Sequence, residues 1–159
     1  MKEYFLEREQ WIARPLPVVF DFFSRAENLG RITPAWLGFR IRAPTPVHMK
    51  VDTRIDYTIR LVGVPMSWRT RITAWEPEAR FVDVQERGPY TLWEHHHQFV
   101  ALGEGVRVID RIRYALPFGP IGRVAHALAV RASLSAIFDY RYDRVRNLLD
   151  DTERREADE

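Results

Sequence analysis

Two histidines and one aspartate stand where two neighbouring strand-like segments would turn them to the same side. His95 and His97 alternate along one segment, and Trp93 and Phe99 mark their face as the buried one. Asp110 lies in the next segment, opposite a face that carries three arginines, so it is expected to point inward. A carboxylate beside an imidazole fixes its tautomer and keeps it basic, as general acid or base catalysis on a ligand carbonyl requires.

The loop between the two segments decides whether these side chains meet. The residues Gly103–Gly105 can close a hairpin with two or four loop residues, and either length leaves Asp110 on the side of the two histidines. A buried carboxylate is costly unless it is paired or hydrogen-bonded. The three residues are therefore candidate catalytic residues. Mutual pairing, with Arg141 or Ser135 as further partners, or simple anchoring of a ligand is the favoured interpretation.

The same residues raise the question of a metal site. His95 and His97 would lie ~7 Å apart on one side of their strand, while His96 faces the other way. Such a pair could chelate a metal ion if Asp110 joined it. The ligand set is otherwise incomplete, and the chain has no Gly-rich phosphate loop. The sequence therefore predicts neither a metal ion nor another cofactor.

Further polar and aromatic residues are candidates for contact with a ligand. Asp83 and Gln85 share a face of a strand-like segment, residues 81–86, whose inward side the pattern leaves ambiguous. If that face is inward, they lie at the cavity wall near Trp93, although a turn-capping role for either fits equally well. Aromatic residues on buried strands are usually plain core, and some of them line pockets. The residues expected to contact a ligand are Trp36, Tyr57, Trp68, Asp83, Gln85, Trp93, Phe99, Tyr114, Phe118 and Ser135.

These residues need a sheet to position them, and the hydrophobic pattern predicts one. Residues 3–12 are typical of a first strand, and two short helices follow it. From about residue 38 to 116 the apolar residues recur with a period of two, which predicts six or seven antiparallel strands in all. Residues 121–149 then predict a single helix, roughly 40 Å long, which can only pack across the concave face of a curved sheet.

Small residues occupy the middle of this helix, where a packed core would use Leu or Ile. They are Ala129, Ala132, Ser133, Ser135 and Ala136. We expect them to face the sheet and to leave room for a small molecule between sheet and helix.

The length and composition indicate how many domains the chain forms and in which cellular compartment it is expected. The 159 residues suit one domain, 46% of them are hydrophobic, and the absence of cysteine excludes disulfides and thiolate metal sites. We expect one domain over residues 1–149 and a charged, flexible tail over residues 150–159. The first residues lack an apolar signal segment, and no apolar run is expected to reach the ~18 residues that cross a bilayer. The sequence predicts a cytoplasmic protein without a membrane span.

Arginine supplies nearly all of the positive charge. Lys2 and Lys50 are the only lysines among 24 basic residues, which face 22 acidic ones. Alternation places many arginines on one convex face: Arg40, Arg42, Arg54, Arg60, Arg69, Arg71, Arg107, Arg111 and Arg113. An RNA or ribosome partner is one interpretation of this face. Acidic residues share it and no aromatic platform accompanies it, so a solvated face is favoured and nucleic acid is not expected as a partner.

Four segments carry a resemblance to a known family: FDFFSRAENLGRITPAW, RFVDVQERGPYTLWEHHHQF, DRIRYALPFGPIGR and AIFDYR. Together with the element order, they resemble the bacterial ligand-binding SRPBCC or polyketide cyclase/dehydrase-like proteins, relatives of START domains and plant Bet v 1 allergens. The resemblance implies an α+β helix-grip fold with a deep cavity for lipids, aromatic polyketides or other apolar molecules.

We therefore expect the protein to bind or carry a hydrophobic small molecule. The alternative is a polyketide cyclase, aromatase or dehydratase that uses His95 or His97 with Asp110 as acid and base. An RNA or ribosome partner on the arginine face is the third interpretation. The sequence does not name the ligand, and it leaves a homo-oligomer open.

Overall fold

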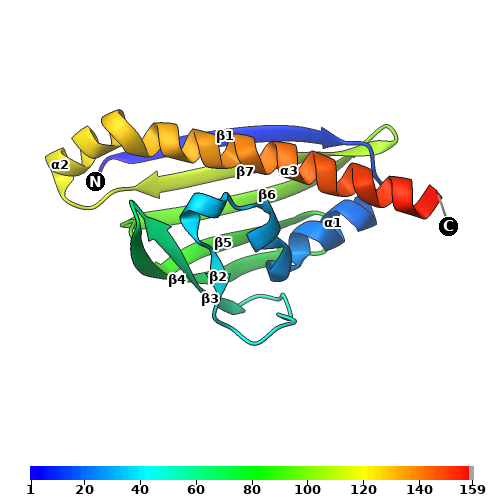
Figure 1. The fold of residues 1–159 in the computed structure, drawn as a ribbon, viewed down its shortest axis with the longest axis horizontal. Helices are drawn as coiled ribbons and strands as arrows, with labels where there is room; N and C mark the ends of the chain where they lie inside the picture. Colours follow the sequence, from blue (N-terminus) through cyan, green and yellow to red (C-terminus); the bar gives the residue numbers. More distant parts are fainter. Residues whose placement is uncertain (158–159) are drawn as a thin grey trace.

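The chain folds as an antiparallel sheet that curls around a long C-terminal helix (Figure 1). The structure, a computed structural model, describes residues 1–157. Its strands are β1 (Glu3–Ile12), β2 (Arg40–Ile41), β3 (Arg54–Leu61), β4 (Val64–Glu76), β5 (Arg80–Arg87), β6 (Leu92–Leu102) and β7 (Gly105–Ala115). Its helical segments are α1 (Leu16–Ser24), η1 (Ala26–Ile32), η2 (Ala35–Leu37), α2 (Gly119–Ala125), η3 (His126–Val130) and α3 (Arg131–Ala157).

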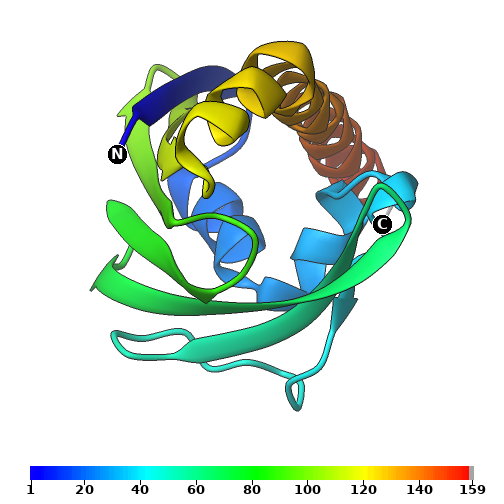
Figure 2. The ribbon, with the colours of Figure 1, turned by 90° about the vertical axis from the view of Figure 1, so that its left-hand side faces the viewer.

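The seven strands form one sheet in the order β1-β7-β6-β5-β4-β3-β2. Every neighbouring pair is antiparallel, and the first strand pairs with the last. Viewed from one end, the sheet curves around the interior and the α2–α3 helix runs along its open side (Figure 2). The predicted α+β helix-grip architecture is confirmed, with seven strands rather than six.

Two helical predictions need correction. The second short helix after β1 is a 3-10 helix, η1, and a further 3-10 turn, η2, follows it. The C-terminal helix is not uniformly α-helical, because the five residues of η3 form a π-helix. The π-helix starts at His126, whose ring stacks on Tyr4 at 3.5 Å and whose Nε2 lies 2.8 Å from the hydroxyl of Tyr114. No Pro or Gly marks this position, so the sequence carries no signal for it.

The helix packs on the sheet through large apolar side chains. Leu134 and Phe138 lie against Ile112 and Tyr114 in one cluster. Farther along, Val145 and Leu149 join a second cluster that includes α1, which lies near the C-terminal half of α3 (Figure 1). These contacts fix which side of the helix faces inward.

The expectation that small residues face the sheet is wrong. Ala129, Ala132, Ser133 and Ala136 are exposed, and Ser135 is half-buried. The reason is that burial of Leu134, Phe138 and Val145 gains far more apolar area than burial of alanine or serine, so their stripe takes the inner face. Any cavity must therefore lie beside large side chains.

One helix, Gly119–Asp150, is long and apolar enough to cross a membrane by length and composition. Its most apolar window of 18 residues has a mean hydropathy of 1.3, which corrects the expectation that arginines and carboxylates break up every such run. Its contacts with the sheet through Leu134 and Phe138 mark it as the core helix of this domain. The apolar residues before η3 are exposed, with Ile121 at 74% and Val124 at 59%.

The convex face of the sheet carries arginines that are paired with carboxylates. Arg54 and Arg71 both contact Glu86, at 2.8 and 2.9 Å. Other pairs on this face join Arg69 to Asp56, Arg111 to Glu7 and Arg113 to Glu94. The alternation predicted from the sequence is thus confirmed for these strands, and acidic partners offset the charge of the face.

The helix α3 continues to Ala157, past the predicted domain boundary at residue 149. Residues 158–159 of the predicted tail lie outside the described residues. The flexible tail over residues 150–159 stays a prediction.

Candidate functional site

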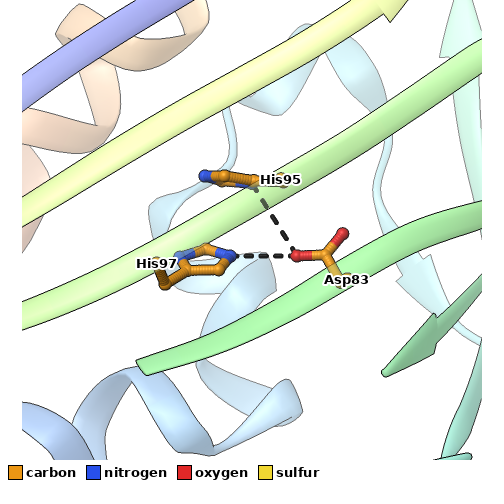
Figure 3. A group of neighbouring side chains, drawn as sticks. All are labelled: Asp83, His95 and His97. Atoms are coloured by element: carbon orange, nitrogen blue, oxygen red, sulfur yellow. Dashed lines mark hydrogen bonds and ion pairs between the residues drawn. The ribbon is translucent and has the colours of Figure 1, made fainter. Parts of the chain in front are cut away.

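Strands β5, β6 and β7 bring four ionisable side chains together on the concave face of the sheet. A turn of two residues joins β6 to β7, since Leu102 pairs with Gly105, and this register sets His97 directly opposite Asp110. On the other side of β6, Asp83 of β5 stands opposite His95 (Figure 3). The predicted meeting of the two histidines with Asp110 is confirmed, and Asp83 joins them. We call Asp83, His95, His97 and Asp110 the His–Asp group.

The two histidines lie between the two carboxylates. Asp110 Oδ1 is 2.9 Å from His95 Nε2 and 3.0 Å from His97 Nδ1. Asp83 Oδ2 is 2.9 Å from His97 Nε2 and 3.8 Å from His95 Nδ1, the two contacts drawn in Figure 3. The imidazole rings themselves lie 3.7 Å apart between centroids. Both rings are therefore fixed by carboxylates from opposite sides.

Burial makes these pairings energetically important. His95, His97 and Asp110 expose 4%, 7% and 9% of their surface. Burial alone would keep Asp110 protonated, but its hydrogen bond from His95 and its ion-pair contact with His97 outweigh it and lower the pKa of the carboxyl group. The pKa of Asp83 is lowered as well, because the His97 hydrogen bond and nearby positive charges outweigh burial. Both carboxylates are ionised at neutral pH.

The two histidines differ in their preferred charge. Burial opposes the positive charge of His97, but the carboxylates of Asp110 and Asp83, the second of them hydrogen-bonded to Nε2, outweigh it and raise its pKa above the ordinary value. For His95, burial and the neighbouring charge of His97 lower the pKa despite the bond to Asp110. His95 is therefore the neutral imidazole of the pair. A carboxylate only accepts hydrogen bonds, so His95 Nε2 carries the hydrogen toward Asp110 and His95 Nδ1 keeps a lone pair.

A cavity of about 180 Å³ lies between the sheet and α3. Asp83, His95 and His97 line it, whereas Asp110 lies behind the histidines and does not. The other walls are mainly apolar and aromatic, and include Phe22, Phe23, Leu29, Ile32, Leu37, Phe39, Ile55, Tyr57, Ile59, Trp68, Tyr90, Trp93, Leu134, Ile137 and Phe138. Asp83, His95 and His97 thus form a polar patch in a largely apolar cavity.

Arg141 of α3 is a second polar group at the cavity wall. Its Nε is buried without a hydrogen-bond partner, and its guanidinium carbon lies 4.8 Å from the centroid of the Phe138 ring. No described carboxylate lies within ion-pair distance of it, so the sequence-based idea that Arg141 or Ser135 completes the His–Asp group is not met. Burial lowers the pKa of Arg141, and the charges of Asp110 and Asp83 oppose this, so the guanidinium stays charged.

A smaller polar set lies on β3 and β4. Trp68 donates a hydrogen bond from Nε1 to Thr70 Oγ1 at 3.0 Å, and the Tyr57 hydroxyl lies 3.4 Å from the same oxygen. Burial raises the pKa of Tyr57, so its hydroxyl stays neutral. The ring of Tyr57 stacks on Trp68, which makes a flat aromatic wall.

Four of the predicted ligand-contact residues line the cavity: Tyr57, Trp68, Asp83 and Trp93. Alternation located Tyr57, Trp68 and Trp93 correctly, because the inner faces of their strands were assigned from neighbouring residues, whereas the facing of the strand that carries Asp83 was ambiguous. Side chains from the helical segments, including Phe22, Ile137 and Arg141, were missed as lining residues. Their only sequence signal is that they lie in the segments that carry the family resemblance.

The other predicted ligand-contact residues do not line this cavity within the part of the chain that the structure describes. Trp36 is 57% exposed and packs against Tyr140, and Phe118 is 78% exposed at the start of α2. Phe99 lies deeper in the core against the ring of Phe20.

Gln85, Tyr114 and Ser135 also lie outside it. The amide of Gln85 donates to the carbonyl oxygen of Tyr90, so it holds the β5–β6 loop, as the turn-capping alternative predicted. Tyr114 instead contacts His126, and Ser135 sits on the half-buried flank of α3.

Solved structures share this architecture. The protein TTHA0849 from Thermus thermophilus is 19% identical, with a TM-score of 0.64. The match covers 89% of this chain and 97% of the chain of TTHA0849. A Thalictrum flavum norcoclaurine synthase mutant in complex with a transition-state analogue is 13% identical over 96% of this chain and 97% of its own, with a TM-score of 0.69. A nucleoside-diphosphate sugar epimerase from Corynebacterium glutamicum is 18% identical over 96% of this chain but only 30% of its own, with a TM-score of 0.68.

Fold and cavity together define a Bet v 1-like protein of the SRPBCC superfamily. More narrowly, the family described as polyketide cyclase / dehydrase and lipid transport matches residues 12–137, and the chain belongs to it. No curated protein matches the sequence. The family supports binding of hydrophobic ligands, or cyclase activity on them, at a general level.

Proposed function

We propose that this protein binds and carries a small hydrophobic molecule that has one oxygen-rich end. The observation that supports the proposal is the cavity itself, in which aromatic and aliphatic walls surround two small polar patches, the His–Asp group and Arg141. Such a combination of apolar walls and a few placed polar groups is typical of ligand sites. As part of the same proposal we place the protein in the cytoplasm.

The volume limits the size of the ligand. A cavity of about 150 Å³ holds benzene, and drug-sized pockets have roughly 300–1,000 Å³. The present 180 Å³ therefore suits one or two aromatic rings or a short acyl chain. A multi-ring polyketide would fit only after α3 or the η1–η2 segment moved outward.

Arg141 supports an oxygen acceptor on the ligand. A guanidinium has five N–H donors, and burying them without acceptors is costly. Because Arg141 Nε is buried without a hydrogen-bond partner and no described carboxylate pairs with the guanidinium, a carboxylate or carbonyl group of the ligand would supply the missing acceptor. The apolar part of the ligand would then lie against Tyr57, Trp68 and Trp93.

The test combines native mass spectrometry with calorimetry. The purified protein is first examined for a bound molecule, then stripped of it and titrated with 2-naphthoate, 2-naphthamide and 2-naphthylamine. We expect the carboxylate to bind most tightly, Arg141→Gln to remove that preference, and Trp93→Ala to weaken all three. A stripped protein that binds none of the three, or prefers the amine, would contradict the proposal.

Catalysis is the second candidate function, and the pairing of His95 supports it. A neutral imidazole with Asp110 behind it and a lone pair on Nδ1 is arranged to accept a proton from a ligand. The corresponding activity would be that of a cyclase, aromatase or dehydratase. With any ligand identified as above, His95→Asn should abolish turnover and leave affinity within a few-fold, and a parallel loss of binding would count against catalysis.

A further inference from the structure

The nitrogen atoms of His95 and His97 divide into two sets, one facing Asp110 and one facing Asp83. Asp110 Oδ1 lies 2.9 Å from His95 Nε2 and 3.0 Å from His97 Nδ1. A carboxylate only accepts hydrogen bonds, so a nitrogen that interacts favourably with it carries a hydrogen. His95 Nδ1 therefore keeps a lone pair, and His97 Nε2, which is hydrogen-bonded to Asp83 Oδ2 at 2.9 Å, would give up its hydrogen to a bound metal ion. Both of them face Asp83 Oδ2 (Figure 3).

Three potential metal-ligand atoms thus converge at the cavity wall. The ligand atoms of Asp83, His95 and His97 all lie within 4.8 Å of one another. Metal–ligand bonds of about 2.0–2.2 Å place neighbouring ligand atoms roughly 3–3.5 Å apart. The measured separations from Asp83 Oδ2, 2.9 and 3.8 Å, bracket that range, so small side-chain rotations would suffice.

We propose that Asp83, His95 and His97 bind a divalent transition-metal ion and that Asp110 orients both imidazoles from behind. A carboxylate on the far nitrogen of a metal-bound histidine is the usual support for such a ligand. Here one carboxylate serves two histidines, and all four residues lie on adjacent strands of one sheet. The proposed ligand set differs from the alternative drawn from the sequence, which used Asp110 as the third ligand.

The donor types indicate which ions fit. Two imidazoles and one carboxylate suit Zn²⁺, Co²⁺, Fe²⁺ or Mn²⁺, whereas Ca²⁺ and Mg²⁺ prefer oxygen alone. Three protein ligands leave at least one coordination position open. Since Asp83, His95 and His97 line the cavity, that position faces the space proposed for the ligand.

The charges indicate what would take the open position. Two carboxylates, a divalent ion and Arg141 leave a net charge of about +1 at the cavity wall, which favours an oxygen anion such as a carboxylate or enolate. This last step rests on the proposed function, whereas metal binding does not require the organic ligand.

The test uses the full-length protein produced without an affinity tag. Metal content is measured by plasma mass spectrometry, and the chelated protein is then titrated with Zn²⁺ and Co²⁺ alone. We expect one ion per chain, and a visible Co²⁺ spectrum with nitrogen ligation. His97→Asn and Asp83→Asn should weaken binding at least about 100-fold, and Asp110→Asn about 10- to 100-fold. His96→Asn is the matched control, because His96 lies on the opposite face beside Glu94 and should bind normally.

The unmodified protein decides the question even if buried variants fail to fold. In its histidine NMR spectrum, Co²⁺ should shift or broaden the ring signals of His95 and His97 far more strongly than those of His48 and His96. A chelated protein that takes up neither ion, or uptake that His96→Asn removes, would overturn the metal site. Neither result would bear on naphthoate binding, so the proposed function is tested separately.

Discussion

The two faces of the sheet use ion pairs of similar length in opposite surroundings. On the convex face, Arg111 lies 2.6 Å from Glu7, and both side chains are more than half exposed. On the concave face, His95 lies 2.9 Å from Asp110, and their side chains are only 5% and 13% exposed. Distance alone therefore does not rank these pairs. Water screens the outer pair at little cost, whereas the inner pair has lost its hydration and depends on its partners.

The largest expected effect is the loss of one inner carboxylate. Asp110→Ala removes a partner of both histidines and leaves the positive charge of His97 with Asp83 alone. Breaking a buried pair in this way costs about 3–5 kcal/mol, so urea unfolding should show a loss in that range. If the free energy of unfolding fell by less than about 1 kcal/mol, the buried His–Asp group would contribute no more than the exposed ion pairs, and the contrast between the two faces would be wrong.

The pH dependence of stability should come from the concave face, and we expect it in metal-free protein. The pKa of His97 is raised in the folded state, so its contribution is fully present below about pH 6.5 and is lost as the pH rises through the folded pKa. The pKa values of Asp83 and Asp110 are lowered, so their contribution is present above about pH 3.9 and is lost in acid. Denaturant unfolding between about pH 2 and pH 9 measures both limbs.

His95 acts with the opposite sign. Its lowered pKa means that stability is lost as the pH falls below about 6.5. His97→Asn should therefore flatten the alkaline limb, and His95→Asn should relieve part of the acid limb. Equal pH profiles for the two variants would show that the histidines are not differentiated.

A smaller effect is expected for a neutral polar group in the cavity. Tyr57→Phe removes only a hydroxyl that lies 3.4 Å from Thr70 Oγ1, a long hydrogen bond. Thermal unfolding should show that the free energy of unfolding falls by at most about 1.5 kcal/mol. A loss as large as that of Asp110→Ala would mean that burial of any polar group, not only of charge, dominates the concave face.

The smallest effect is expected outside. Arg111→Gln breaks the pair with Glu7 and should change the free energy of unfolding by less than about 1 kcal/mol, with even less effect in high salt. Urea unfolding at two salt concentrations checks this expectation. A salt-independent loss above about 2 kcal/mol would show that the convex face supports the fold more than its exposure implies.

The sequence predicted the sheet well because alternation is a local property. Three arginines on one side of β7 fixed the inward direction of Asp110, and Trp93 did the same for the histidines. The contact of the histidines with Asp83 was harder to predict from the sequence. The inward face of β5 was ambiguous, and the pairing of β5 with β4 is interrupted by register shifts. Alternation cannot reveal which residue of a neighbouring strand stands opposite a given side chain.

The helix side of the cavity could not be predicted in the same way. The apolar residues of α3 define its inner face, but their distance from the sheet depends on the curvature of all seven strands. Arg141 could therefore be placed on the helix but not at the cavity wall. Phe118 and Trp36 do not line the cavity, and the sequence could not show this, because a large aromatic side chain in a loop-like segment carries no signal that separates an exposed position from a lining one.

The aromatic wall gives the protein an optical readout of its own. Trp68 and Trp93 line the cavity, and the Trp93 ring lies 6.5 Å from that of His95, whereas Trp11 and Trp36 are about half exposed, at 52% and 57%. The buried and exposed indoles should therefore emit at different wavelengths. A molecule that enters the cavity should change only the blue part of the emission, and quenching of that part by Co²⁺ would come from an ion within a few ångströms of Trp93.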